Sequence, residues 1–237
     1  MTDQTTSRLS LPLVQAAQAQ KHVTVNESLA RLDGLVNLVL ASLYRSTPPA
    51  AVVDGTCYAV PPGATDAWAG QEGRIAIGSN GGWVFADAHA GMKAFVSDIG
   101  VDAIFDGDIW VEGALTLGTF GSALVARTAE VEVTLTAGAS VTTDLYIPNS
   151  AMVIGATARV TEAITGTLTS WRLGTDGAFD RFGSGLGIQQ GSWARGMLSQ
   201  PFTYWDPTPI ILSATGGQFA SGRVRIAAHW FELTMPR

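Results

Sequence analysis

The second half of the chain consists largely of short segments in which apolar and polar residues alternate. The alternation is strictest at residues 130–135 and 223–227. Because successive side chains of a strand point to opposite faces of its sheet, this period predicts half-buried β-strands. The β-prone segments are residues 130–136, 140–146, 151–160, 169–173, 208–214 and 222–233. Glycine-rich turns separate them and no helical period intervenes, so we predict a jelly-roll-like antiparallel β-sandwich over residues 127–237.

The first half of the chain begins with a predicted amphipathic helix. Asn26 is a suitable N-cap, and apolar residues then recur at helical spacing until Pro48 and Pro49 prevent continuation. The apolar positions are Leu29, Leu32, Leu35, Val36, Val39, Leu40 and Leu43. Such a face must be buried, either against the chain's own β-domain or against a second copy of the helix. In the second alternative, the oligomerisation or attachment residues are Leu29, Leu32, Val36, Val39 and Leu43.

Short β-prone segments separated by glycine follow this helix, and they predict a small β-domain. These segments are residues 56–60, 74–78, 83–86, 93–96 and 104–105. The chain is therefore expected to be mainly β, in four parts. The parts are an N-terminal segment with the helix at residues 1–50, the small β-domain at 51–111, a connector at 112–126 and the sandwich at 127–237.

Charge and hydropathy argue against two classes of partner. The net charge is −6, only 14% of residues are charged, and Lys and Arg form no cluster, so we expect no nucleic-acid binding. No apolar run is long enough to cross a bilayer, since even residues 35–43 are interrupted by Asn37 and Ser42. The first residues lack the basic and apolar regions of a secretion signal. We therefore expect a chain that is made in the cytoplasm and does not insert into membranes.

Neither the cysteine nor the histidines predict a metal or cofactor site. Cys57 is the single cysteine, so the chain can form no internal disulfide and no four-thiolate zinc site. We expect Cys57 to be a small buried residue of a strand. The histidines, His22, His89 and His229, are far apart and lack the spacing of metal ligands. No cofactor and no metal are predicted.

A series of short motifs gives the first half a family resemblance. The motifs lie at residues 11–33, 54–58, 67–70, 73–76, 82–85, 94–96 and 106–110. In this order and approximate spacing they resemble an uncharacterised domain family of phage tail and fibre proteins and of head-spike proteins of alphaproteobacterial gene transfer agents. Residues 180–187 and 191–196 resemble the carboxy-terminal part of the same spike and fibre proteins.

This resemblance implies a structural protein of a released phage-like particle. The expected role is a head spike that adheres to host cell-surface polysaccharide such as capsule, with a tail fibre as the second placement. The expected partners are other particle proteins, such as those of a capsid vertex or a second spike or fibre protein. Because spikes and fibres are symmetric, a homo-oligomer is expected, either a trimer or a pentamer.

Residues 174–204 are predicted to form a long connection of the sandwich, and this segment concentrates polar groups beside an aromatic ring. Asp, Gln and Arg form paired hydrogen bonds with sugar hydroxyls, and Trp stacks on the face of a sugar ring. The glycan-binding candidates are Asp176, Asp180, Arg181, Gln189, Gln190, Trp193 and Arg195. In the alternative interpretation, Asp–Arg pairs fix the loop and Trp193 anchors it to the sandwich.

The small β-domain holds a second group of aromatic residues. Trp68, Trp83 and Trp110 are candidates for an aromatic platform that binds a sugar, or else they are the core of a domain with few strands. Two rival functions also stay open. An enzyme that degrades glycans would use Asp176 and Asp180 as its two carboxyl groups, although no motif supports it and we expect no enzyme. An architectural adaptor of the spike or tail would bind no glycan.

Overall fold

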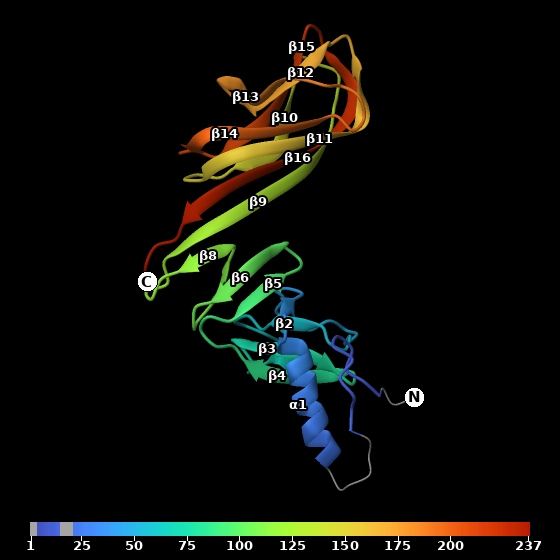
Figure 1. The fold of residues 1–237 in the computed structure, drawn as a ribbon, viewed down its shortest axis with the longest axis vertical. Helices are drawn as coiled ribbons and strands as arrows, with labels where there is room; N and C mark the ends of the chain where they lie inside the picture. The colour runs from blue at the N-terminus through green and yellow to red at the C-terminus, as the bar shows by residue number, and fades with distance from the viewer. Residues whose placement is uncertain (1–3, 15–20) are drawn as a thin grey trace. The chain divides into compact units, whose positions relative to one another are not determined.

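The structure is a computed structural model that describes residues 4–14 and 21–237. It divides into two compact units, which are described separately (Figure 1). Unit 1 contains the chain up to Ala123 together with Pro236–Arg237, and unit 2 contains Leu124–Met235. The division falls within residues 112–126, the segment expected to connect the domains. Within that segment lie the end of one strand, the whole of a second and the beginning of a third.

Unit 1 combines one α-helix with a mainly antiparallel sheet. The strand order in the sheet is β4-β3-β2-β1-β5-β6-β7, and the short central strand β1 pairs in parallel with both of its neighbours. The elements are α1 Lys21–Leu35, β1 Val39–Leu40, β2 Cys57–Ala59, the 3-10 helix η1 Asp66–Trp68, β3 Arg74–Ser79, β4 Gly82–Asp87, β5 Lys93–Val96, β6 Val101–Phe105, β7 Trp110–Glu112 and β8 Ala114–Leu117.

The helix of unit 1 both begins and ends earlier than the sequence predicts, since Asn26, the expected N-cap, lies within it. It begins at Lys21 and ends at Leu35, and Val39–Leu40 forms strand β1 instead of a further helical turn. Asn37 adopts a left-handed conformation with φ of 48°, which terminates the helix. Leu40 is then fully buried in the sheet, where it pairs with Cys57 and Val96. The prediction that Val39, Leu40 and Leu43 lie on a helix is therefore wrong, because burial in the sheet outweighs the helical spacing.

Two residues connect the N-terminal segment to the end of α1: Arg8 of the segment and Asp33 of the helix. The Arg8 guanidinium donates hydrogen bonds to the carbonyl oxygens of Asp33, Gly34 and Asn37, at 3.0, 2.8 and 2.8 Å. The buried Asp33 carboxylate accepts hydrogen bonds from the Thr6 hydroxyl at 2.7 Å and from the backbone N–H groups of Arg8 and Leu9. These contacts satisfy carbonyl groups that a helix C-terminus leaves unpaired.

Unit 2 is a sandwich of two antiparallel sheets. One sheet has the order β10-β15-β12-β13, and the other contains β14-β11-β16-β9. Residues of both sheets form one buried core, in which Trp171, Leu173, Phe182 and Ile226 are almost fully enclosed. The strands are β9 Ala123–Thr134, β10 Ser140–Ile147, β11 Met152–Gly166, β12 Ser170–Thr175, β13 Ala178–Leu186, β14 Trp193–Thr203, β15 Thr208–Thr215 and β16 Phe219–Leu233. The prediction of a mainly β chain with an N-terminal helix and an antiparallel sandwich is confirmed.

The segment 174–204 is not the long loop that its glycines suggest. It contains strands β13 and β14, and only residues 187–192 connect them. Glycine is required here for close packing: a methyl group on Gly196 of β14 would overlap the carbonyl oxygen of Phe182 in β13. A glycine-rich composition is typical of loops and also of strands that another backbone approaches closely, and here the second explanation holds.

Candidate functional site

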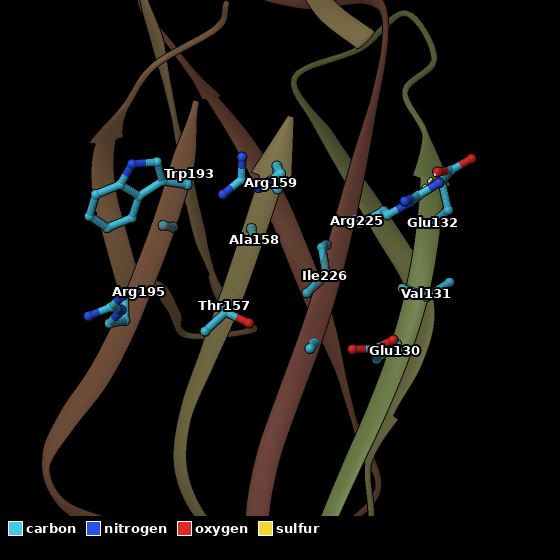
Figure 2. A pocket seen from close by; sticks show the side chains of 12 residues that line it. Glu130, Val131, Glu132, Thr157, Ala158, Arg159, Trp193, Arg195, Arg225 and Ile226 are labelled. Carbon is cyan, nitrogen blue, oxygen red and sulfur yellow. Dashed lines mark hydrogen bonds and ion pairs between the residues drawn. The ribbon is translucent and has the colours of Figure 1, made fainter. Parts of the chain in front are cut away.

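An open hollow of about 630 Å³ lies on the face of the β14-β11-β16-β9 sheet that points away from the core of the sandwich (Figure 2). All four strands contribute to it. The lining residues are Glu130, Val131, Glu132, Thr157, Ala158, Arg159, Trp193, Ala194, Arg195, Arg225, Ile226 and Ala227.

Strand register arranges the outward side chains in two parallel rows. Across β14, β11, β16 and β9, each residue lies opposite the next, so that side chains of a row point to the same face. The first row, here called the Trp193 row, is Trp193, Arg159, Arg225 and Glu132. The second, the Arg195 row, is Arg195, Thr157, Ala227 and Glu130. Three strand spacings separate the ends of each row, or about 14 Å.

Alternation along β14 places the aromatic ring at the surface. Trp193 is 62% exposed, Arg195 is also exposed, and Ala194 between them is buried against the core. The Arg195 guanidinium lies 5.8 Å from the centroid of the Trp193 ring. One end of the hollow therefore presents a large exposed ring and a cation side by side, within hydrogen-bonding reach of a ligand that covers the ring.

Ion pairs occupy the opposite end of the hollow. The Arg225 guanidinium donates to the Glu132 carboxylate at 2.7 Å, and Arg223 lies 3.5 Å from the same carboxylate and 3.4 Å from that of Glu162. The hydrogen bond from Arg225 is the main cause that holds the pKa of Glu132 below its ordinary value, with a further contribution from the charge of Arg223. Glu132 is therefore a carboxylate at neutral pH.

Two arginines of the hollow have no such counter-ion. Within the described parts of the chain, neither Arg159 nor Arg195 forms an ion pair with a carboxylate. Both are exposed and both line the hollow beside Trp193. Their guanidinium groups are donors available to a ligand.

A histidine ring stabilises the sheet surface next to the Arg195 row. The His229 ring nitrogens lie 3.1 Å from the Thr128 hydroxyl and 3.3 Å from the Thr157 hydroxyl. These three residues come from β16, β9 and β11, so the contacts hold the three strands together across the outer face. Thr157 is thereby fixed in position at the centre of the hollow.

The structure brings together two of the seven sequence-predicted glycan-binding residues at the hollow. Trp193 and Arg195 line it, whereas Asp176, Asp180, Arg181, Gln189 and Gln190 do not.

The remaining five residues lie elsewhere on unit 2. Asp176 accepts a hydrogen bond from the Gly177 N–H at the β12–β13 turn, and Asp180 is an exposed residue of β13. Gln189 is exposed in the β13–β14 connection, and the neighbouring Gln190 amide donates to the Thr161 carbonyl oxygen at 3.0 Å. In β13, the Arg181 guanidinium lies 4.2 Å from the centroid of the Phe202 ring. The alternative in which Asp–Arg pairs fix this segment finds no support, since in the described chain Arg181 stacks on an aromatic ring instead.

The predicted aromatic platform of unit 1 is a core cluster. Trp68 is fully buried, and its ring centroid lies 5.1 Å from those of both Tyr58 and Trp83. Trp110 packs against Phe105 at 5.2 Å and does not join that cluster. Trp68 is buried and cannot stack on a sugar, and Trp83 and Trp110 are half-buried against core residues, which agrees with the alternative in which these rings form the core of a small unit.

The predicted oligomerisation residues do not share one face. Leu29 is half-buried and Leu32 is exposed on α1, Val36 and Val39 are exposed beyond its end, and Leu43 is buried. The early end of α1 separates them. Only the exposed members of this set are accessible to another chain.

Sequence reasoning missed the residues that complete the hollow, which are Glu130, Glu132, Thr157, Arg159 and Arg225. The alternation at residues 130–135 and 223–227 marks three of them as outward-facing. What the sequence lacks is the strand order, which places β11 between β14 and β16 and so brings residues more than 30 positions apart into one row.

Three comparisons with known proteins accompany this geometry. No curated protein matches the chain. A chain of a solved structure, the "Cyanophage Pam1 capsid asymmetric unit", is similar with 21% sequence identity and a TM-score of 0.35, and the match covers 50% of this chain and 91% of that one. No helix in the described chain is long and apolar enough to span a membrane. Residues 25–111 match the model of a family described as "Protein of unknown function (DUF2793)".

Proposed function

We propose that this chain is a structural protein of a phage-like particle and that unit 2 attaches the particle to polysaccharide on the host cell. One observation carries the proposal: in an open hollow on the sheet face, the exposed Trp193 ring lies beside two arginines that form no ion pair with the described residues. The motifs within residues 11–110, which resemble those of spike and fibre proteins, support the particle role.

The hollow has the chemistry that recognises sugars. The apolar C–H face of a pyranose ring stacks on an exposed aromatic ring such as Trp193, and its hydroxyl groups pair with charged and hydroxyl side chains. Thr157 supplies a hydroxyl, Glu130 a carboxylate, and Arg195 a guanidinium in the same row. Because the hollow is open along the sheet, it suits a segment of an extended polysaccharide.

Attachment by such a site depends on copy number. A shallow site on one chain binds weakly, and linked sites gain strength when several engage the same surface. We place the chain in a homo-oligomeric spike of the head, a trimer or a pentamer, joined to a capsid vertex or to a second spike or fibre protein. A tail fibre is the second placement.

The proposed activity is binding without turnover. Glycoside hydrolysis uses two carboxyl groups on either side of the scissile bond. The pair weighed from the sequence, Asp176 and Asp180, lies outside the hollow, on a turn and an exposed strand. We therefore expect no release of sugar when the protein is incubated with capsule, and no effect of Asp176→Asn or Asp180→Asn on this result.

Binding to capsulated cells and to matched acapsular cells tests the proposal. The purified chain is expected to bind only the capsulated cells, and Trp193→Ala is expected to weaken that binding about tenfold. Trp205→Ala is the matched control, because Trp205 is 72% exposed and does not line the hollow. Equal and negligible binding to both cell types would leave the chain as an architectural adaptor and reject the adhesin role.

A further inference from the structure

We infer that the sugar bound beside Trp193 carries a carboxylate, as a hexuronic acid does, and that Arg159 and Arg195 bind this group. The inference rests on the proposed function and names the chemical class of the ligand. Two observations on the sheet face lead to it: the position of the two arginines and the ion pairing of the others.

The two arginines flank one position. Trp193 lies opposite Arg159, and Arg195 lies opposite Thr157, in consecutive rows of the β14–β11 pair. Arg159 and Arg195 are therefore diagonal neighbours on the same face, within about 8 Å of each other at the backbone. Arginine side chains are long enough to reach across that distance by changing rotamer, so one carboxylate above the strand pair can accept from both guanidinium groups.

Charge pairing distinguishes these arginines from their neighbours. Arg225 pairs with the carboxylate of Glu132, and Arg223 lies within ion-pair distance of the carboxylates of both Glu132 and Glu162. Arg159 lies directly opposite Arg225, although like charges in directly opposed positions destabilise a sheet. Arg159 therefore lies next to another cation and forms no ion pair with a carboxylate of the described residues, an arrangement that an external anion would stabilise.

The rest of the protein does not attract polyanions. The net charge is −6, so long-range electrostatic repulsion opposes the approach of an acidic polysaccharide, and affinity must come from local contacts. Glu130 places a carboxylate at the far end of the Arg195 row, whereas the Glu132 carboxylate is paired with Arg225 and Arg223. A polymer with acidic groups on successive sugars would meet Glu130, so the hollow suits a polymer in which uronic acid alternates with neutral sugars.

The probe is polysaccharide released from the capsulated cells used above, before and after its carboxyl groups are reduced to alcohols. Reduction is expected to weaken binding about tenfold or more, because hydrogen bonds to a charged group are lost. Arg159→Ala and Arg195→Ala are expected to weaken binding of the native polymer to a similar extent without further weakening that of the reduced polymer. Melting temperatures of both variants verify folding.

Arg31→Ala is the matched control, because it removes an exposed arginine of unit 1 that neither lines the hollow nor pairs with a residue that does. Its affinity is expected to stay within about twofold of the parent. Equal affinity for native and reduced polymer, or equal behaviour of all three arginine variants, overturns the inference. Binding that depends on Trp193 yet ignores reduction overturns this inference alone, whereas absence of binding to the native polymer rejects the proposed function as well.

Discussion

Trp193 and Arg159 lie directly opposite each other on antiparallel strands β14 and β11, with both residues lining the outer hollow of unit 2. The backbone of the sheet fixes this relationship, so neither side chain depends on a flexible loop for its position. A substitution of either side chain is therefore expected to change ligand binding at the hollow without changing the fold.

Trp193→Ala is expected to change stability by no more than about 0.5 kcal/mol, since the ring is 62% exposed. The same change is expected to lower affinity for capsular polysaccharide about tenfold through the loss of ring stacking. Urea unfolding and direct binding measurements on the same preparation check both parts. A large loss of stability would show that Trp193 serves the fold.

Gly196→Ala is expected to destabilise unit 2 by about 1–3 kcal/mol, because the added methyl group overlaps the Phe182 carbonyl oxygen. Gly82→Ala is the control, since a methyl group there meets no atom closer than 3.8 Å and the backbone needs no positive φ. Hydrogen-exchange mass spectrometry of peptides from β13 and β14 measures the effect. Protection that is unchanged in Gly196→Ala would contradict the close approach of the two strands.

Cys57 is expected to resist thiol reagents in the folded protein. Burial is the main cause that raises the pKa of its thiol to about 11, so the reactive thiolate is scarce at pH 8. The side chain is also 1% exposed, and its sulfur lies 3.6 Å from the Gly34 carbonyl oxygen. Labelling with iodoacetamide should be slow in buffer and fast in guanidinium chloride. Equal rates in the two solvents would contradict this burial.

Asp33→Ala is expected to destabilise the packing of the N-terminal segment on α1 by about 3 kcal/mol, because the buried Thr6 hydroxyl and the part-buried N–H groups of Arg8 and Leu9 lose their acceptor. Glu27→Ala on the same helix removes only an exposed pair with Arg31 and should cost about 0.5 kcal/mol or less. Hydrogen exchange of peptides from α1 distinguishes the variants. Similar exchange in both would show that Asp33 does not hold the segment.

Acid is expected to weaken unit 1 through Asp106. Burial raises the pKa of this carboxyl, but the backbone N–H groups of Ile109 and Asp108 and the charge of Arg237, 2.8 Å away, lower it further, so the net shift is downward. A lowered folded-state pKa gives stability that is complete above the ordinary value of 3.8 and is lost as the pH falls through the folded value.

Asp106→Asn should therefore destabilise unit 1 at neutral pH, and its difference from the parent should shrink below pH 3.8. Asp108→Asn is the control, because that side chain is 87% exposed. Pulse proteolysis, with products mapped to residues 101–112, follows the change. A difference that is constant with pH would exclude Asp106 as the titrating group.

Periodicity in the sequence predicts the strands of unit 2 because each has one buried and one solvated face. It fails where tertiary contacts decide the structure. Leu40 fits a helical stripe by spacing, yet it is buried in a sheet between Cys57 and Val96. Gly196 fits a loop by composition, yet it is a strand residue under another backbone. The hollow could be predicted only in part for the same reason. The sequence alone marks Trp193 as a candidate binding residue, whereas the strand order is needed to place Arg159 beside it.

Successive side chains of β14 point to opposite faces of the sheet. Ala194 and Gly196 face the interior, and Trp193 and Arg195 face solvent. The interior pair tolerates little change, while the solvent pair contributes little to packing. Single substitutions at the solvent-facing positions can therefore change the chemistry of the outer surface while the fold of the sandwich stays the same. Under the proposed function, one scaffold could in this way carry many attachment specificities.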